Sequence, residues 1–383
     1  MKKPGERIEE ITTAPSTSGA ILADTVNFPF LAIVGQEEMK RALILSVVNP
    51  RVGGVLLIGP RGTGKTTTVR GLVDLLPPVR RSLCPLGCEP QAAFALGMDA
   101  VCPNCAQKLA MGEEITALDR MRLVELPLNA RLEDVIGGIN ERVAVEQGRI
   151  LLERGILSYA HGNILYIDEI NLLDDVIVDA ILDAAAQGRY TVRRGPLART
   201  YQARFVLIGS MNPEEGYLRP QIMDRLGLRV VVSGLTAPED RLEVYRRVVA
   251  FSENPHQFAA RYTDETAALT EEIALAKELL PQVTIRPEAE KAVTDLINSL
   301  RIATHRAEIV TLEAARAYAT ADGRTEVTVT DIAAVAPMAL RQRRSEFIER
   351  YLEESNREDK EIRMALGELE RGQRKTKRKK RMR

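Results

Sequence analysis

Short, continuous apolar runs alternate with amphipathic stretches through the first two thirds of the chain. Each run has the length of a strand that is buried on both faces. The runs cover residues 55–58, 123–126, 164–167 and 205–208. Helical spacing of apolar residues marks the stretches 36–48, 66–76 and 174–186. This alternation predicts an α/β fold with a parallel sheet, whose ligands bind at the carboxyl ends of the strands.

The strand signal fades after Pro238, and residues 239–335 are predicted to be mostly helical. From residue 345 to 370 the pattern predicts a highly charged helix. We therefore divide the chain into four parts. They are a loose N-terminal arm (1–27), an α/β domain (28–236) with a cysteine-rich insertion (80–118), a helical domain (237–343), and a charged helix with a basic tail (344–383).

The formal net charge of zero hides an asymmetry along the chain. Residues 371–383 carry nine Lys or Arg side chains and no acid, which leaves 44 basic against 53 acidic residues elsewhere. The body is therefore acidic, whereas a nucleic-acid-binding fold needs a basic footprint. Nucleic acid is disfavoured as a partner of this body. For the tail, a solvated segment is favoured over one that binds RNA or anionic lipid.

No apolar run approaches the ~18 residues that cross a bilayer, and the polar residues 1–6 lack the apolar core of a secretion signal. We therefore expect no membrane span and a cytoplasmic location. In that compartment the four cysteines are expected to stay reduced or to bind a metal rather than form a disulfide framework.

A glycine-rich turn directly follows the first predicted strand and precedes a helix. It fits the phosphate-binding loop (P-loop) pattern in full, with Gly59, Pro60, Arg61, Gly62, Thr63, Gly64, Lys65 and Thr66. The glycines allow consecutive N–H groups to face the phosphates of ATP. Lys65 is then placed to meet the β- and γ-phosphates, and Thr66 to bind Mg²⁺. The alternative is a chance glycine-rich turn, against which the strand–loop–helix context argues.

Two adjacent carboxylates end the predicted strand at residues 164–167. A P-loop requires a carboxylate that holds Mg²⁺ and a group that orients the attacking water. We assign the first role to Asp168, which binds the metal directly or through water, and the second role to Glu169. The alternative interpretation is that both carboxylates only cap a helix N-terminus.

Four cysteines form two short pairs, Cys84 with Cys88 and Cys102 with Cys105, separated by 13 residues. Four thiolates at this spacing suit a tetrahedral Zn²⁺ site, whose role would be structural because no coordination position stays open. Such a site would also give rigidity to an insertion that is too polar to fold alone. Four unconnected thiols and a redox switch remain as alternatives.

Several motifs outside the P-loop carry a family resemblance. The segment IVGQE at residues 33–37 resembles the one that precedes the P-loop in AAA+ proteins generally. Further segments are VELPL (124–128) with Gly137 and Gly138, GNILYIDEINLLD (162–174), GSMNPEEG (209–216) and LRP (218–220), with Asp224 and Arg225 after it. These segments resemble the magnesium chelatase I subunit, a family of AAA+ ATPases. The resemblance covers residues 28–343, and the segments NPEEG and LRPQ are more selective than the ATP-binding motifs.

The resemblance implies an AAA+ domain with a C-terminal helical lid, and roles for three further residues. Asn212 matches sensor 1, which helps Glu169 to position water. Arg225 matches the arginine finger, which acts on the ATP of a neighbouring subunit and is worth about 10³–10⁵ in rate; a surface salt bridge is the alternative. Arg306 matches sensor 2, which reaches the γ-phosphate, although Arg301 lies nearby. A finger that acts across subunits implies a hexameric ring.

The same resemblance implies the ATPase motor of a magnesium chelatase-type complex. ATP hydrolysis would remodel a partner with a von Willebrand A-type domain. That partner would drive a porphyrin-binding subunit to insert Mg²⁺ into protoporphyrin IX, in chlorophyll or bacteriochlorophyll biosynthesis. The rival hypothesis is a chaperone-like AAA+ ATPase that remodels or metallates a protein partner, because both classes use the same ATP motifs.

Three departures from the family pattern bear on the choice of partner rather than on ATP chemistry. Residues 191–196 are basic where the family has a hairpin insertion with acidic residues, and Leu226 replaces the usual Phe after the finger. Residues 344–383 extend beyond the family's usual end. The identity of the remodelled substrate therefore stays open.

Overall fold

The computed structural model describes residues 26–139, 146, 152–195, 197–345, 350, 351, 354, 357, 358, 360 and 362–364. The predicted N-terminal arm lies outside the described residues except for residues 26 and 27. The predicted basic tail lies wholly outside them, and the charged helix over 345–370 lies inside only in part.

The centre of the molecule is a five-stranded sheet whose neighbouring strands all run parallel. Its spatial order is β4 (Leu123–Leu126), β5 (Ile164–Ile167), β8 (Val206–Met211), β1 (Val55–Ile58) and β9 (Leu228–Val231). The four strands predicted from apolar runs are all present. The fifth, β9, was not predicted because Arg229 interrupts its apolar run. Arg229 is nevertheless buried, with 1% of its surface exposed.

Each face of the sheet is covered by a separate apolar cluster. Alternate side chains of β1 divide between them, since Val55 and Leu57 belong to one cluster, and Leu56 and Ile58 to the other. The first face is covered by α1 (Glu37–Val48) and α2 (Lys65–Leu72), the second by α5 (Leu132–Ile136), α7 (Ile156–Ala160), α8 (Asp175–Gln187) and α9 (Pro220–Arg225). Short 3₁₀ turns link these elements at η1 (Phe30–Ala32), η2 (Pro50–Val52), η3 (Val73–Leu75), η5 (Ile170–Leu172) and η6 (Pro213–Glu215).

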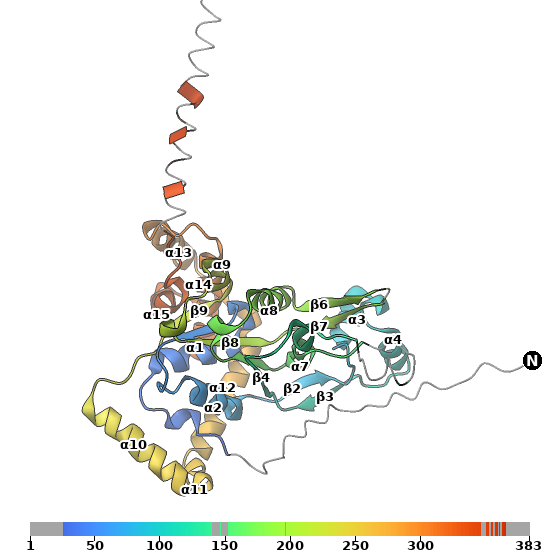
Figure 1. The fold of residues 1–383 in the computed structure, drawn as a ribbon, viewed down its shortest axis with the longest axis horizontal. Helices are drawn as coiled ribbons and strands as arrows, with labels where there is room; N and C mark the ends of the chain where they lie inside the picture. The colour runs from blue at the N-terminus through green and yellow to red at the C-terminus, as the bar shows by residue number, and fades with distance from the viewer. Residues whose placement is uncertain are drawn as a thin grey trace, which may run out of the picture.

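The C-terminal part is helical, as predicted. It comprises α10 (Pro238–Glu253), α11 (Pro255–Ala260), α12 (Thr263–Leu279), η7 (Leu280–Gln282), α13 (Pro287–Ser299), α14 (Arg306–Ala321) and α15 (Val329–Leu340), with a small parallel pair of β10 (Thr284–Ile285) and β11 (Glu326–Val327). Helices α12 and α14 pack on α1, and α13 and α15 pack on α14, so that all four share the apolar cluster of α1. Helices α10 and α11 project from the body (Figure 1). The lid thus rests on the first face of the sheet.

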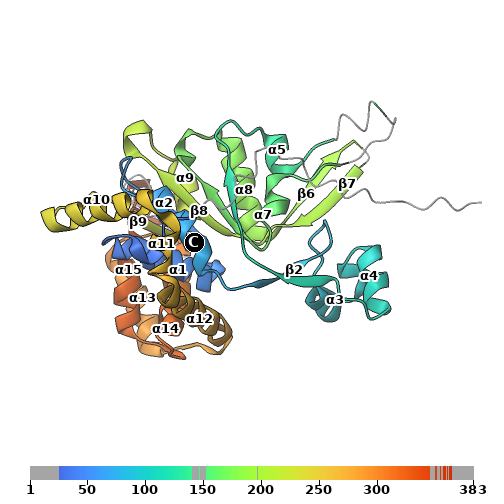
Figure 2. The same ribbon diagram turned by 90° about the horizontal axis from the view of Figure 1, so that it is seen from below.

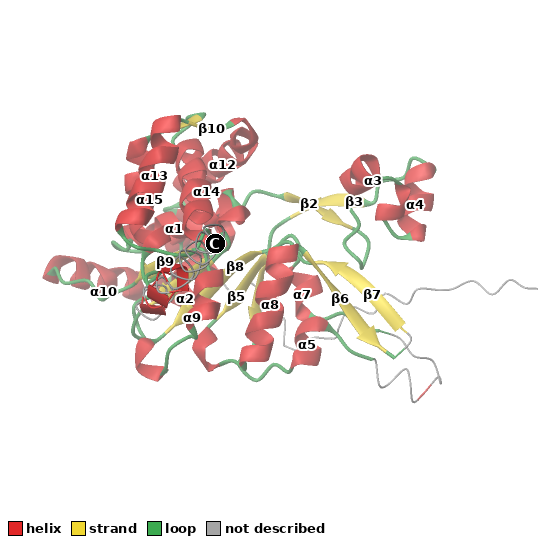
Figure 3. Cartoon of the chain, turned by 90° about the horizontal axis from the view of Figure 1, so that it is seen from above, coloured by secondary structure: helices red, strands yellow, loops and turns green. Residues whose placement is uncertain are grey.

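Two further segments extend from the opposite end of the sheet (Figures 2 and 3). One is the antiparallel hairpin of β6 (Arg189–Arg194) and β7 (Leu197–Gln202), at the position where the sequence predicts a basic hairpin. The other is the cysteine-rich insertion. An antiparallel pair of β2 (Val79–Ser82) and β3 (Thr116–Asp119) carries α3 (Pro90–Leu96), η4 (Met98–Ala100) and α4 (Pro103–Ala110).

Among the described residues, no helix combines the length and the apolar character that crossing a bilayer requires.

Candidate nucleotide-binding site

The P-loop connects the carboxyl end of β1 to the N-terminus of α2. A side chain at Gly59 is excluded, because a Cβ atom there would lie 1.9 Å from the carbonyl oxygen of Val232. Gly62 and Gly64 adopt φ angles of 77° and 85°, which favour glycine, and a Cβ at either would meet open space. The first N–H groups of an α-helix have no carbonyl partner within it. The loop and helix therefore form a cradle that suits the phosphates of a nucleotide.

The ammonium group of Lys65 lies inside this loop. Its Nζ atom donates hydrogen bonds to the carbonyl oxygens of Gly59 and Pro60 at 2.7 and 2.8 Å. Burial lowers the pKa of Lys65, while the carboxylates of Asp168 and Glu169 oppose this shift. Because its present acceptors are neutral carbonyl groups, a phosphate oxygen can replace them with a charge-assisted hydrogen bond.

Oxygen ligands for a divalent cation converge between α2 and β5. The hydroxyl of Thr66 donates to Oδ2 of Asp168 at 3.4 Å, and the hydroxyl of Tyr166 donates to Oδ1 at 2.9 Å. Ser210 on β8 also donates to Oδ1 of Asp168. Burial raises the pKa of Tyr166, so its hydroxyl stays protonated and able to donate. A carboxylate surrounded by hydroxyl groups is a donor set that Mg²⁺ accepts, and the residues present therefore fit the ion.

Glu169 follows in a left-handed backbone conformation, with φ of 51°. Its N–H donates to the hydroxyl of Ser210 at 3.0 Å, which fixes the turn against β8. Its carboxylate pairs with Arg61 of the P-loop at 2.8 Å. Arg61 also pairs with Glu215 at 2.8 Å, and these interactions, the hydrogen bond to Glu169 first, raise the pKa of Arg61.

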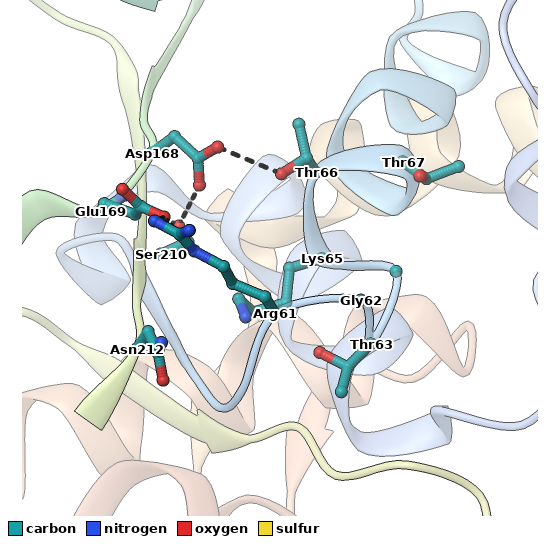
Figure 4. Close-up of a pocket in the computed structure, with 11 residues that line it drawn as sticks. Arg61, Gly62, Thr63, Lys65, Thr66, Thr67, Asp168, Glu169, Ser210 and Asn212 are labelled. Atoms are coloured by element: carbon teal, nitrogen blue, oxygen red, sulfur yellow. Dashed lines mark hydrogen bonds and ion pairs between the residues drawn. The ribbon is translucent and has the colours of Figure 1, made fainter. Parts of the chain in front are cut away.

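These groups line one pocket of about 300 Å³ at the carboxyl ends of β1, β5 and β8 (Figure 4). Its walls are the P-loop residues from Arg61 to Thr66 with Thr67, the carboxylates of Asp168 and Glu169, and the side chains of Ser210 and Asn212. Asn212 is buried, and its side-chain oxygen accepts a hydrogen bond from the N–H of Glu214 at 3.3 Å. The structure thus brings together the residues predicted for ATP, for Mg²⁺ and for sensor 1.

The two arginines predicted by resemblance lie elsewhere. Arg225 ends α9 and pairs with Asp183 at 2.8 Å and Asp179 at 3.4 Å, both on α8. Arg306 begins α14 and lies 3.8 Å from Asp224. Among the described residues that line the pocket, neither arginine is present. Their roles stay predictions.

Three residues of the site were not predicted from the sequence: Tyr166, Ser210 and Glu215. Side chains two positions apart on a strand share a face. Tyr166 precedes Asp168 by two positions, and Ser210 precedes Asn212 by two. This two-residue spacing is the sequence signal that could have identified Tyr166 and Ser210. Glu215 gave no such signal, because its contact with Arg61 depends on how β8 lies beside β1.

The four cysteines converge in the insertion, away from the pocket. Their Sγ atoms all lie within 4.8 Å of one another, and those of Cys84 and Cys102 are 3.7 Å apart. The two short cysteine motifs that are separated in the sequence therefore lie side by side in the structure.

Family comparisons match two parts of the chain. The family described as magnesium chelatase, subunit ChlI, matches residues 29–84 and 140–233. The AAA lid domain matches residues 290–364.

Individual proteins are similar over most of their length. A magnesium-chelatase subunit ChlI homolog of Methanocaldococcus jannaschii is 45% identical, over 84% of this chain and 87% of the relative. The magnesium-chelatase 38 kDa subunit of Acidiphilium rubrum is 44% identical, over 82% and 90% respectively. A crystal structure of a protein from Cytophaga hutchinsonii covers 82% of this chain and 84% of its own, at a TM-score of 0.52 and 20% identity, and supports the fold alone.

Proposed function

The chain belongs to the magnesium chelatase subunit ChlI family, and we propose that it is the ATP-hydrolysing motor of a magnesium chelatase-type complex. The observation that carries this proposal is the single pocket that unites Lys65, Thr66, Asp168 and Glu169 at the carboxyl ends of β1 and β5. Phosphoryl transfer requires positioning and charge stabilisation more than covalent chemistry, and this pocket offers both.

Each group has one task in this mechanism. The N–H groups at the start of α2 and the ammonium of Lys65 hold the phosphates. Thr66 and Asp168 would hold Mg²⁺, which neutralises negative charge on the phosphates when it is bound. Glu169 orients and polarises the attacking water, and Asn212, 4% exposed on the same pocket wall, restricts where that water sits. Tyr166 and Ser210 position the Asp168 carboxylate.

We infer that Arg225 and Arg306 both act on the ATP of a neighbouring subunit. Arg225 immediately follows Asp224, and Arg306 lies 3.8 Å from the same carboxylate. The two arginines therefore lie close together in the surface region formed by α9 and the first turn of α14, where the Arg225 side chain points toward α8. Neither arginine lines the pocket of its own chain. In a ring where this surface faces the P-loop of the next subunit, both arginines would reach the ATP that is bound there. A closed hexameric ring satisfies that requirement in every subunit.

Two partners complete the proposal. A subunit with a von Willebrand A-type domain would receive the conformational work of the ring, and a porphyrin-binding subunit would carry protoporphyrin IX. We further propose a cytoplasmic location and a role in chlorophyll or bacteriochlorophyll biosynthesis. The chaperone-like alternative is not favoured. The relatives from two different organisms are both named as magnesium-chelatase subunits, and each is similar to more than four fifths of this chain.

The test is reconstitution of the whole complex. The purified chain, both partner subunits, protoporphyrin IX, Mg²⁺ and ATP are mixed, and the fluorescence of magnesium protoporphyrin is followed. We expect product only when ATP and the wild-type chain are present, and none with Lys65→Ala. ATP hydrolysis without any product in the complete mixture would contradict the chelatase proposal and favour the chaperone-like alternative.

A further inference from the structure

The cysteine-rich insertion brings four thiols to one point. Cys84 and Cys88 lie on the turn after β2, Cys102 precedes α4, and Cys105 lies in its first turn. All four Sγ atoms lie within 4.8 Å of one another. Two backbone N–H groups also face the sulfurs, that of Leu86 at 3.4 Å from Cys84 Sγ and that of Cys102 at 3.3 Å from Cys88 Sγ.

These distances suit a tetrahedral metal site. A tetrahedron with Zn–S bonds of about 2.3 Å has sulfur–sulfur edges of about 3.8 Å. The Sγ atoms of Cys84 and Cys102 are 3.7 Å apart, whereas a disulfide requires about 2.05 Å. Disulfides would also join the cysteines only in pairs, so they give no reason for all four to converge. N–H groups that point at the sulfurs stabilise thiolates and orient them as ligands.

The insertion has little else to hold it together. Its buried apolar cluster comprises Cys88, Ala93, Val101, Cys105 and Ile115. Two of these five are the thiols themselves, and a core of this size cannot offset the conformational entropy of the segment. Small domains of this kind commonly depend on a structural metal for their stability.

The turn that carries Cys84 and Cys88 contacts the base of the β6–β7 hairpin. The N–H of Gln202, the last residue of β7, donates to the carbonyl oxygen of Leu86 at 3.1 Å. Gly87 lies so close that a Cβ atom there would be 2.8 Å from Cβ of Gln202 and 3.0 Å from the ring of His161. Glycine is therefore required at this point, both for space and for its φ of 75°.

A second contact joins the same two segments through charged groups. Glu89, which follows Cys88, pairs with Arg204 at 2.9 Å and lies 3.5 Å from the ring of His161. Arg204 follows the end of β7 by two residues, and its N–H donates to Nδ1 of His161 at 3.3 Å. The position of the hairpin base is thus coupled to the conformation of the turn that holds two of the four cysteines.

We propose that Cys84, Cys88, Cys102 and Cys105 bind one Zn²⁺ ion, and that this ion fixes the 84–88 turn against the base of the β6–β7 hairpin. Binding converts the four thiols to thiolates and releases their protons. The closed shell of four sulfurs leaves no position for a substrate, so the ion is structural. The inference does not depend on the ATPase proposal, because the pocket residues lie outside the insertion.

Metal content is the first test. Wild-type protein purified without chelator should contain about one zinc per chain, as four ligands for one ion require. Cys102→Ser should lose most of this zinc, whereas the matched control Asn104→Ser, an exposed position two residues further on, should keep it. Metal-free wild-type protein with four titratable thiols, or with two disulfides by mass spectrometry, would overturn the zinc site.

Hydrogen exchange tests the connection to the hairpin. In Cys102→Ser the Gln202 amide should exchange about tenfold faster or more, because its acceptor at Leu86 is no longer held. Asn104→Ser should leave that amide as protected as in the wild type, and ATP binding should persist in both variants. Unchanged protection of Gln202 in zinc-free protein would show that the ion does not fix the hairpin base, and would overturn that part of the proposal.

Discussion

The guanidinium of Arg61 lies 2.8 Å from the carboxylate of Glu169, so a side chain of the phosphate-binding loop pairs with the proposed catalytic base. Arg61 contacts Glu215 as well, and its own side chain is 68% exposed. A carboxylate engaged by a guanidinium is a poorer acceptor for the proton of water. Arg61 therefore restrains Glu169 for as long as this ion pair persists in the nucleotide-bound protein.

This relationship predicts that Arg61→Met raises basal ATP turnover at saturating ATP. The ion pair is solvent-exposed and therefore weak, so the increase is expected to be modest, up to about fivefold. The control is Arg70→Met, which removes a similarly exposed ion pair between Arg70 on α2 and Glu125 on β4. Steady-state phosphate release measures both. A turnover number that falls or stays constant in Arg61→Met, with the control unchanged, would argue against restraint of Glu169 by Arg61.

The second prediction concerns action across the subunit boundary. Arg225→Ala removes the proposed finger, and Lys65→Ala removes the phosphate-binding lysine, so each variant alone should hydrolyse ATP at a small fraction of the wild-type rate. Mixed rings pair an intact P-loop with an intact finger and should recover part of the activity. Phosphate release is measured over several mixing ratios. If every mixture is as inactive as its components, Arg225 does not act in trans.

The sequence predicted those site residues that belong to contiguous motifs. It did not predict the residues that reach the site through contacts between strands. The P-loop and the pair Asp168–Glu169 are local motifs that follow recognisable apolar strands, and their strands were found correctly. The contacts of Ser210 with Asp168 and of Glu215 with Arg61 depend on β8 lying between β5 and β1, which no local pattern specifies.

Strand β9 was not predicted for a similar reason. Its buried Arg229 breaks the apolar run, and the guanidinium donates to the carbonyl oxygens of Met223 and of Arg341, the latter more than a hundred residues away. This position is removed from water, and burial lowers the pKa of Arg229 to about 10. Long-range compensation of this kind cannot be read from neighbouring residues.

A third prediction follows from Arg343, a fully buried side chain next to α9. Its guanidinium donates to the Asp224 carboxylate at 2.8 Å and to the carbonyl oxygens of Leu226 and Gly227 at 3.0 and 2.8 Å. It therefore positions the residues on both sides of Arg225 from the end of the lid.

Arg343→Met removes the donor to Oδ1 of Asp224 and to the two carbonyl oxygens, and should lower the free energy of unfolding by about 3–5 kcal/mol, measured by urea denaturation. The control Arg286→Met removes a solvent-exposed pair with Glu326 and should leave the free energy of unfolding nearly unchanged. ATPase activity at a temperature where the variant is folded should also fall, because the finger loses its support. Wild-type stability and activity in Arg343→Met would exclude this positioning role.

The central claim is that the chain hydrolyses ATP with Glu169 as the group that activates water. Glu169→Gln keeps the size of the side chain and leaves Lys65, Thr66 and Asp168 in place, but it removes the carboxylate that accepts a proton. The most direct measurement is single-turnover hydrolysis of pre-bound ATP by this variant and by the wild type. We predict that Glu169→Gln binds ATP as the wild type does and releases almost no phosphate. Wild-type hydrolysis in the variant would contradict the claim.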